Sequence, residues 1–243
     1  MLLGHFAVAL AAKRAAPRTS LGTLFVAAQL LDLVWPILLL AGVERVRIVP
    51  GLMAASSLDF VHYPFSHSLL AALGWAALAG LAYFALRRDS RGAGVIAALV
   101  ASHWFLDAPM HRPDLPLWPG SSILVGGGLW SSVPATVSIE LSLLTAGLLV
   151  YLRATRAQRA AGRWGPWGLA ALLLAIFLSG FVTAPPPSER ALAFGAMGLW
   201  ILVALGFWID GARRVAEPVL STAQGGDGSG TQPASMRPRW RNP

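Results

Sequence analysis

Histidines and carboxylates stand out in a sequence that is otherwise strongly apolar. His103 and Asp107 are four residues apart, so on a helix they share one face. His62 and His67 flank Pro64, which places His62 in a loop and His67 at the start of the next apolar run. Neutral imidazoles and carboxylates are nitrogen and oxygen ligands that zinc and similar divalent ions prefer. The pattern therefore indicates a metal site.

Further ionisable residues are spread along the chain. His5 lies in a short apolar stretch, Asp32 and Glu140 lie inside longer ones, and His111 and Asp114 occupy a polar segment. An ionisable side chain at the middle of a membrane costs about 2.5–3.5 kcal/mol on insertion scales, so each needs a partner or a function. We therefore treat all five as candidate site residues.

The composition is that of an integral membrane protein, with 56% hydrophobic and only 12% charged residues. The chain has no cysteine, which excludes disulfides and thiolate metal sites. Any bound metal ion must then be held by nitrogen and oxygen ligands.

The elements that position these residues are apolar runs long enough to cross a bilayer as helices. Six such runs cover residues 20–41, 67–86, 92–108, 133–152, 166–183 and 190–210. A shorter run, residues 1–12, would reach only about 18 Å as a helix and is predicted to be a half-membrane or re-entrant element. Pro36 lacks the N–H that would bond the carbonyl of Asp32, so we expect a kink at Asp32. The predicted fold is all-α, a polytopic bundle of about six transmembrane helices plus a short N-terminal helix.

Charge asymmetry predicts the orientation. If the six runs alternate in direction, all but four of the 19 basic residues fall on one side, the exceptions being Arg45, Arg47, Arg112 and Arg190. By the positive-inside rule the basic loops are cytoplasmic, which places the histidines on the periplasmic or outer side of an inner membrane. Such basic runs are typical of topology signals and lipid contacts, so no nucleic acid is expected as a partner. Residues 1–215 form the predicted membrane domain, and the Gly/Ser/Pro-rich residues 216–243 a disordered cytoplasmic tail.

A set of short motifs follows one order along the chain. It comprises an early GH at His5, an aspartate before a proline at Asp32, H-x4-H-S at His62, His67 and Ser68, and H-x3-D at His103 and Asp107. This order resembles the predicted inner-membrane metal-dependent hydrolases, a bacterial family that includes a LexA-regulated type and is thought to be distantly similar to zinc-dependent phospholipase C. The resemblance covers about residues 1–152. It implies a helical membrane bundle whose metal ligands are His5, Asp32, His67, His103 and Asp107.

Two motifs depart from the family pattern. The usual H-R-G-x-T-H-S is HYPFSHS here, and the usual Asp-x-Asp is Asp32-Leu33-Val34. A missing ligand could be replaced by Glu140 or Asp114, the site could bind one ion where relatives bind more, or it could be non-catalytic.

The leading hypothesis is an outward-facing, metal-dependent hydrolase acting on a lipid ester or phosphoester, with zinc as the expected ion. A bound water of lowered pKa would be the nucleophile, and His62, His111 or Glu140 would act as general base or proton relay. The alternatives are a proton or metal-ion transporter and a non-catalytic membrane protein whose polar residues hold helices together. Transport should need polar groups in the cytoplasmic half, where the sequence shows almost none. The pattern therefore favours a one-sided site that takes a membrane lipid or a small molecule.

Overall fold

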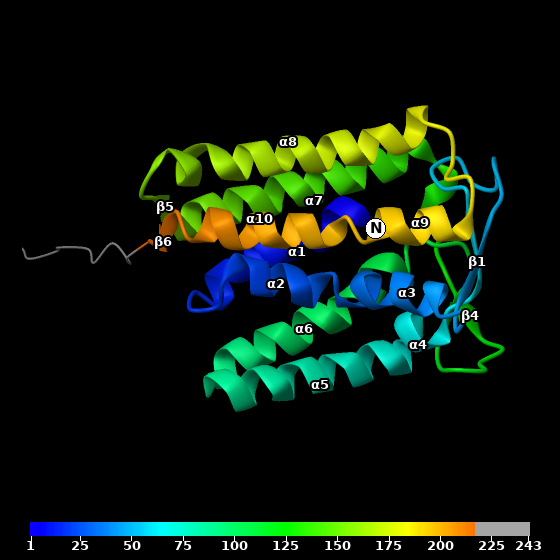
Figure 1. The fold of residues 1–243 in the computed structure, drawn as a ribbon, viewed down its shortest axis with the longest axis horizontal. Coiled ribbons are helices and arrows are strands. Elements are labelled where there is room, and N and C mark those ends of the chain that lie inside the picture. The colour runs from blue at the N-terminus through cyan, green and yellow to red at the C-terminus, as the bar shows by residue number, and fades with distance from the viewer. Residues whose placement is uncertain (217–243) are drawn as a thin grey trace, which may run out of the picture.

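Helices make up most of the structure, a computed structural model that describes residues 1–216. They are α1 (Leu2–Ala15), α2 (Leu21–Ala28), α3 (Leu30–Leu40), α4 (Pro64–His67), α5 (Leu69–Arg87), α6 (Ser90–Asp107), α7 (Val133–Ala154), α8 (Ala160–Val182), α9 (Glu189–Ala196) and α10 (Leu199–Asp210). The longer helices lie side by side along one direction (Figure 1). The predicted tail lies outside the described residues from residue 217 onward.

Four of the described helical segments are long and apolar enough to cross a membrane. They are α5, α7, α8 and the continuous segment Glu189–Asp210 formed by α9 and α10. The bent pair of α2 and α3 would make a fifth span. The expected number of about six is not confirmed, because α6 is not among these helices. Arg91, His103 and Asp107 lower the hydropathy of α6 although it has the length of a span.

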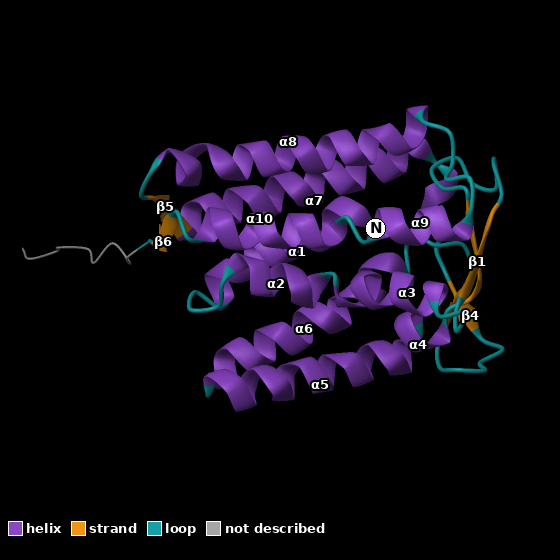
Figure 2. Cartoon of the chain, viewed as in Figure 1, coloured by secondary structure: helices purple, strands orange, loops and turns teal. Residues whose placement is uncertain are grey.

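Short two-stranded sheets lie at the ends of the bundle, which the all-α prediction did not include. They pair β1 (Arg45–Ile48) with β2 (Leu58–His62), β3 (Leu115–Pro116) with β4 (Leu124–Val125), and β5 (Thr155–Ala157) with β6 (Arg213–Val215), all antiparallel. The labelled strands β1 and β4 lie at one end of the bundle, and β5 and β6 lie at the opposite end (Figure 2). The pairing of β5 with β6 joins the end of α7 to the end of α10, far apart in sequence.

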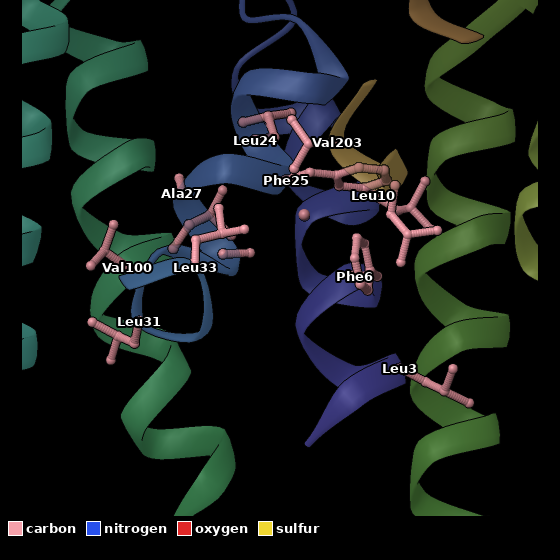
Figure 3. Packing of buried hydrophobic residues seen from close by; sticks show 14 of the residues in the cluster. Leu3, Phe6, Leu10, Leu24, Phe25, Ala27, Leu31, Leu33, Val100 and Val203 are labelled. Atoms are coloured by element: carbon pink, nitrogen blue, oxygen red, sulfur yellow. The ribbon is translucent and has the colours of Figure 1, made fainter. Parts of the chain in front are cut away.

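Helix α1 lies inside the bundle and starts near the middle of its length, where the N-terminus is marked in Figure 1. It has 14 residues and carries Lys13 and Arg14 in its last turn. Its side chains Leu3, Phe6 and Leu10 are buried in the main apolar cluster (Figure 3). The ring of Phe6 meets that of Phe25 from α2 edge to face, with centroids 4.9 Å apart. These contacts form the apolar layer between the two ends of the bundle.

The break between α2 and α3 bends the chain by 56° at Gln29. The prediction of a kink at Asp32 was therefore wrong by one helical turn. Pro36 lies within α3, which continues to Leu40. The carbonyl of Ala28, at the end of α2, instead accepts a hydrogen bond from His103 at 2.8 Å. The bend is thus supported by a contact with another helix, and it leaves Asp32 in the first turn of α3.

Candidate metal centre

Four side chains from three different elements converge where α3, α4 and α6 meet. Nε2 of His103 lies 3.2 Å from Oδ2 of Asp107 and 3.7 Å from Oδ1 of Asp32. Nε2 of His67 lies 3.4 Å from the same Asp32 oxygen and 4.0 Å from Oδ2 of Asp107. Ligands held 2.0–2.1 Å from a tetrahedral ion are about 3.3–3.4 Å apart. The separations of 3.2 and 3.4 Å match this value and those of 3.7 and 4.0 Å exceed it, and Asp32, His67 and His103 present ligand atoms close enough together to hold one ion.

The hydrogen bonds of His103 fix which ring nitrogen is free. The carbonyl oxygen of Ala28 can only accept, so Nδ1 of His103 must carry the hydrogen of that bond. In the neutral ring Nε2 then holds a lone pair. This buried nitrogen has no hydrogen-bond partner among the described residues, although it faces Asp107. A lone pair that faces a carboxylate is repelled unless a proton or a metal cation lies between them.

His67 is held in the same tautomer by a second chain of hydrogen bonds. The hydroxyl of Ser66 donates to Oε2 of Glu44 at 2.6 Å, so its only hydrogen is used there. Nδ1 of His67, 2.7 Å from the Ser66 oxygen, must therefore be the donor in that contact. The free lone pair of His67 is again on Nε2, the atom that faces the carboxylates. Both imidazoles thus direct a free Nε2 lone pair toward Asp32 and Asp107.

Glu44 organises the short helix α4 from outside it. One carboxylate oxygen accepts the backbone N–H groups of Phe65 and Ser66, each at 2.8 Å, while the other accepts the Ser66 hydroxyl. The side chain is buried. Sequence reasoning did not select Glu44 or Ser66, because nothing in their local spacing marks them. The one feature of the sequence that could have indicated such a role is that Ser66 directly precedes His67.

We expect Ser66→Ala to weaken metal binding without removing it. The substitution deletes the acceptor of the Nδ1 hydrogen of His67, and loss of such a supporting group typically costs about 10–100-fold in metal affinity. Titration of the purified protein with zinc against a competing chelator measures this change. The control is Ser68→Ala, because Ser68 caps the first turn of α5 through the N–H of Ala71 at 3.2 Å. That variant should lose about 1 kcal/mol of stability and keep its metal affinity, and equal affinities for the two variants would contradict the assigned role of Ser66.

The second carboxylate oxygen of Asp107, Oδ1, contacts two groups at the start of the chain. Oδ1 accepts from the amino group of Met1 at 2.7 Å and lies 3.1 Å from Nε2 of His5. The ring of His5 stacks on that of His103, with centroids 3.7 Å apart and planes 9° apart. His5, His103 and Asp107 also present ligand atoms close enough together to hold an ion. The structure therefore brings all five expected ligands into one cluster, as two three-residue groups that share His103: His5, His103 and Asp107, and Asp32, His67 and His103.

Glu140 belongs to α7, and its side chain lies beside the first turn of α1 and caps that helix. Its two carboxylate oxygens accept the backbone N–H groups of Leu2 at 3.0 Å and Gly4 at 2.8 Å. The first N–H groups of a helix have no partner within it, and inside a membrane they cannot use water. Because both oxygens of Glu140 are engaged in this way, the geometry favours a capping role over proton transfer.

The other two residues expected to transfer protons are His111, which follows α6, and His62, which ends β2. His111 is buried, with Nδ1 2.9 Å from Asp114, and the hydroxyl of Tyr63 donates to the same Asp114 oxygen at 2.9 Å. Burial lowers the pKa of His111 and raises the pKa of Tyr63 well above its usual value. The ring centroids of Tyr63 and His67 are 5.4 Å apart. The group formed by His111, Asp114 and Tyr63 therefore lies next to the metal-ligand cluster. His62 is exposed and lines a polar cavity of about 530 Å³, which Tyr63 and Asp114 also line.

Apolar helices around a buried cluster of histidines and aspartates define a multi-pass membrane protein with a candidate metal centre. A family model described as YdjM inner membrane protein matches residues 1–205, and the chain belongs to this family. Neither the curated proteins nor the solved structures include a match to the chain. The family assignment agrees with the predicted inner-membrane location.

Proposed function

We propose that the protein is a metal-dependent hydrolase whose active site is embedded in the membrane. The observation that carries the proposal is the pair of Nε2 lone pairs, on His67 and His103, directed at the same two carboxylates. A donor set of two imidazoles and two carboxylates matches zinc, and the chain has no thiolate to offer. A divalent ion in such a site polarises an ester or phosphoryl oxygen and lowers the pKa of a water molecule.

Residues of the chain would contact the substrate and transfer protons. Asp32 is the ligand candidate open to a substrate, since its side chain is 27% exposed whereas those of His67, His103 and Asp107 are at most 4% exposed. Among the residues expected to move protons, His111 alone has a buried hydrogen-bonded connection, through Asp114 to Tyr63 beside His67. We assign the proton relay to His111 on this ground. We also propose that the basic loops are cytoplasmic, which places the site in the outer half.

The polar groups in the opposite half of the bundle give little support to a transport function. One buried ion pair lies there, between Lys13 and Asp210 at 2.7 Å. Along α1, the buried side chains of Phe6 and Leu10 lie between His5 and Lys13 and belong to the apolar layer (Figure 3). Ions and protons crossing a bundle need a continuous polar route, and this layer interrupts it.

Metal analysis of the detergent-purified protein tests the proposal. We expect wild type to carry bound zinc and His103→Ala to lose it, because His103 belongs to both groups of possible ligands. His62→Ala is the control, since His62 is exposed on the outer cavity and should leave the metal content unchanged. Ester or phosphoester hydrolysis should disappear on chelation and return with zinc. Wild-type protein that binds no metal would remove the hydrolase proposal and favour a purely structural role for the cluster.

A further inference from the structure

An apolar cavity of about 540 Å³ opens beside the candidate metal centre. Its walls come from α1, α3, α8, α9 and α10, and include Leu172 and Ile176 of α8 and Leu199 and Leu202 of α10. The volume lies within the range of about 300–1,000 Å³ that small-molecule sites occupy. Asp32 is the one ionisable residue in this lining. The cavity is thus an apolar chamber with a single carboxylate in its wall.

The chamber reaches the candidate ligands at Asp32. Among the four candidate ligands Asp32, His67, His103 and Asp107, Asp32 is partly exposed and the other three are buried. The polar outer cavity that His62 and Arg112 line includes none of the four. A substrate that reaches Asp32 therefore meets apolar walls and not the polar outer surface.

The chamber borders the part of the surface that faces the hydrocarbon of the membrane. Ile176 is 41% exposed and Ile201 is 65% exposed, and both lie on segments that qualify as membrane spans. At Gly195 an added Cβ would meet no atom within 4 Å, so the wall of the chamber is open at this point. Trp35, also in the lining, has a buried indole N–H without a partner among the described residues. A molecule there would need an apolar body and a polar group for Asp32.

We propose that this chamber takes a hydrocarbon chain of a membrane phospholipid that enters sideways from the bilayer. The polar linkage of that lipid would then lie at Asp32, beside the two histidines. The proposal rests on the proposed function for the identity of the reacting group, and it names the substrate as a phospholipid. A soluble ester could not use the apolar route, whereas a lipid needs no transfer into water to follow it.

Photolabelling of the full-length protein tests this route. The probe is a phosphatidylethanolamine with a diazirine in one acyl chain, added in trace amounts to the detergent-purified protein, and labelled residues are mapped by mass spectrometry. We expect labels on Leu172, Ile176 and Ile201, at least fivefold reduced in Gly195→Phe, whose ring would fill the chamber. Gly74→Phe is the matched control, because Gly74 of α5 also has open space at its Cβ position but lines no described cavity. It should label like wild type.

The same samples separate failure of the route from failure of the metal site. Equal labelling of Gly195→Phe and Gly74→Phe, or labels as strong on Leu81 of α5 as in the chamber, would overturn the phospholipid route. Metal content is measured in parallel and should stay at the wild-type level in both variants, which also shows that they are folded. Metal-free protein that labels selectively in the chamber would support the lipid route and contradict the proposed function.

Discussion

Replacing Asp107 with asparagine is expected to reduce metal binding by more than the roughly 10–100-fold typical for loss of a supporting residue. The substitution preserves the size of the side chain but removes the charge that faces His103 and His67 through one oxygen and Met1 and His5 through the other. Zinc bound per protein, measured by elemental mass spectrometry after dialysis, should fall from about one to near zero.

The control for this experiment is Asp89→Asn at the opposite end of α6. Asp89 caps the first turn of α6 by accepting from the N–H of Gly92 at 3.0 Å, and asparagine can do the same. Metal content and stability should both match wild type. Full zinc occupancy in Asp107→Asn would show that the aspartate is not a ligand and would refute the assignment of the centre.

A second large effect is expected at Gly147 of α7, where α1 and α7 pack closely. A Cβ at this position would lie 2.7 Å from the Cα of Ala7 and close to the Ala7 carbonyl, so backbone atoms would have to move. We expect Gly147→Ala to lower the free energy of unfolding by about 1–3 kcal/mol, as overpacking does in a rigid interior. Thermal unfolding in detergent measures the change. Displacement of α1 should also weaken zinc binding, since α1 carries His5.

Gly168 of α8 provides the opposite case. It also lies within a helix, but a Cβ there would meet nothing within 4 Å. Without a steric cost, Gly168→Ala should leave stability unchanged or raise it by up to about 1 kcal/mol, the difference in helix propensity. If both alanine variants raised stability by the same amount, helix propensity alone would explain the result at Gly147 and close packing would not.

Much of the helical framework could be predicted from the sequence, because a membrane span is a local property. The run 133–152 became α7, Val133–Ala154, and the run 67–86 became α5, Leu69–Arg87. Helix α6 shows the limit of this reasoning. The predicted span 92–108 corresponds to α6, but the polar residues of this helix lower its hydropathy, and it is not among the described helices that are apolar enough to cross a membrane.

Residue types and the spacing of His103 and Asp107 predicted a metal site, and the family resemblance implied its set of ligands, but neither predicted the residues that support these ligands. The Glu44–Ser66–His67 chain and the contact of His103 with Ala28 join residues up to 75 positions apart. The bend at Gln29 was misplaced for the same reason, since its stabilising partner is on another helix. The predicted kink was placed where Pro36 removes a backbone hydrogen bond. The helix breaks at Gln29 instead, and α3 continues through Pro36.

The capping of α1 by Glu140 has a consequence for how the protein is assembled in the membrane. Helix α1 is synthesised long before α7, yet the bond from the N–H of Leu2 to Glu140 joins residues 138 positions apart. A helix that begins at mid-depth exposes polar backbone groups that lipid cannot satisfy. Until α7 is inserted, α1 should therefore remain at the membrane surface or inside the insertion machinery. Although α1 precedes α7 in the chain, it would be among the last elements to reach its final position, and the histidine cluster would form only then.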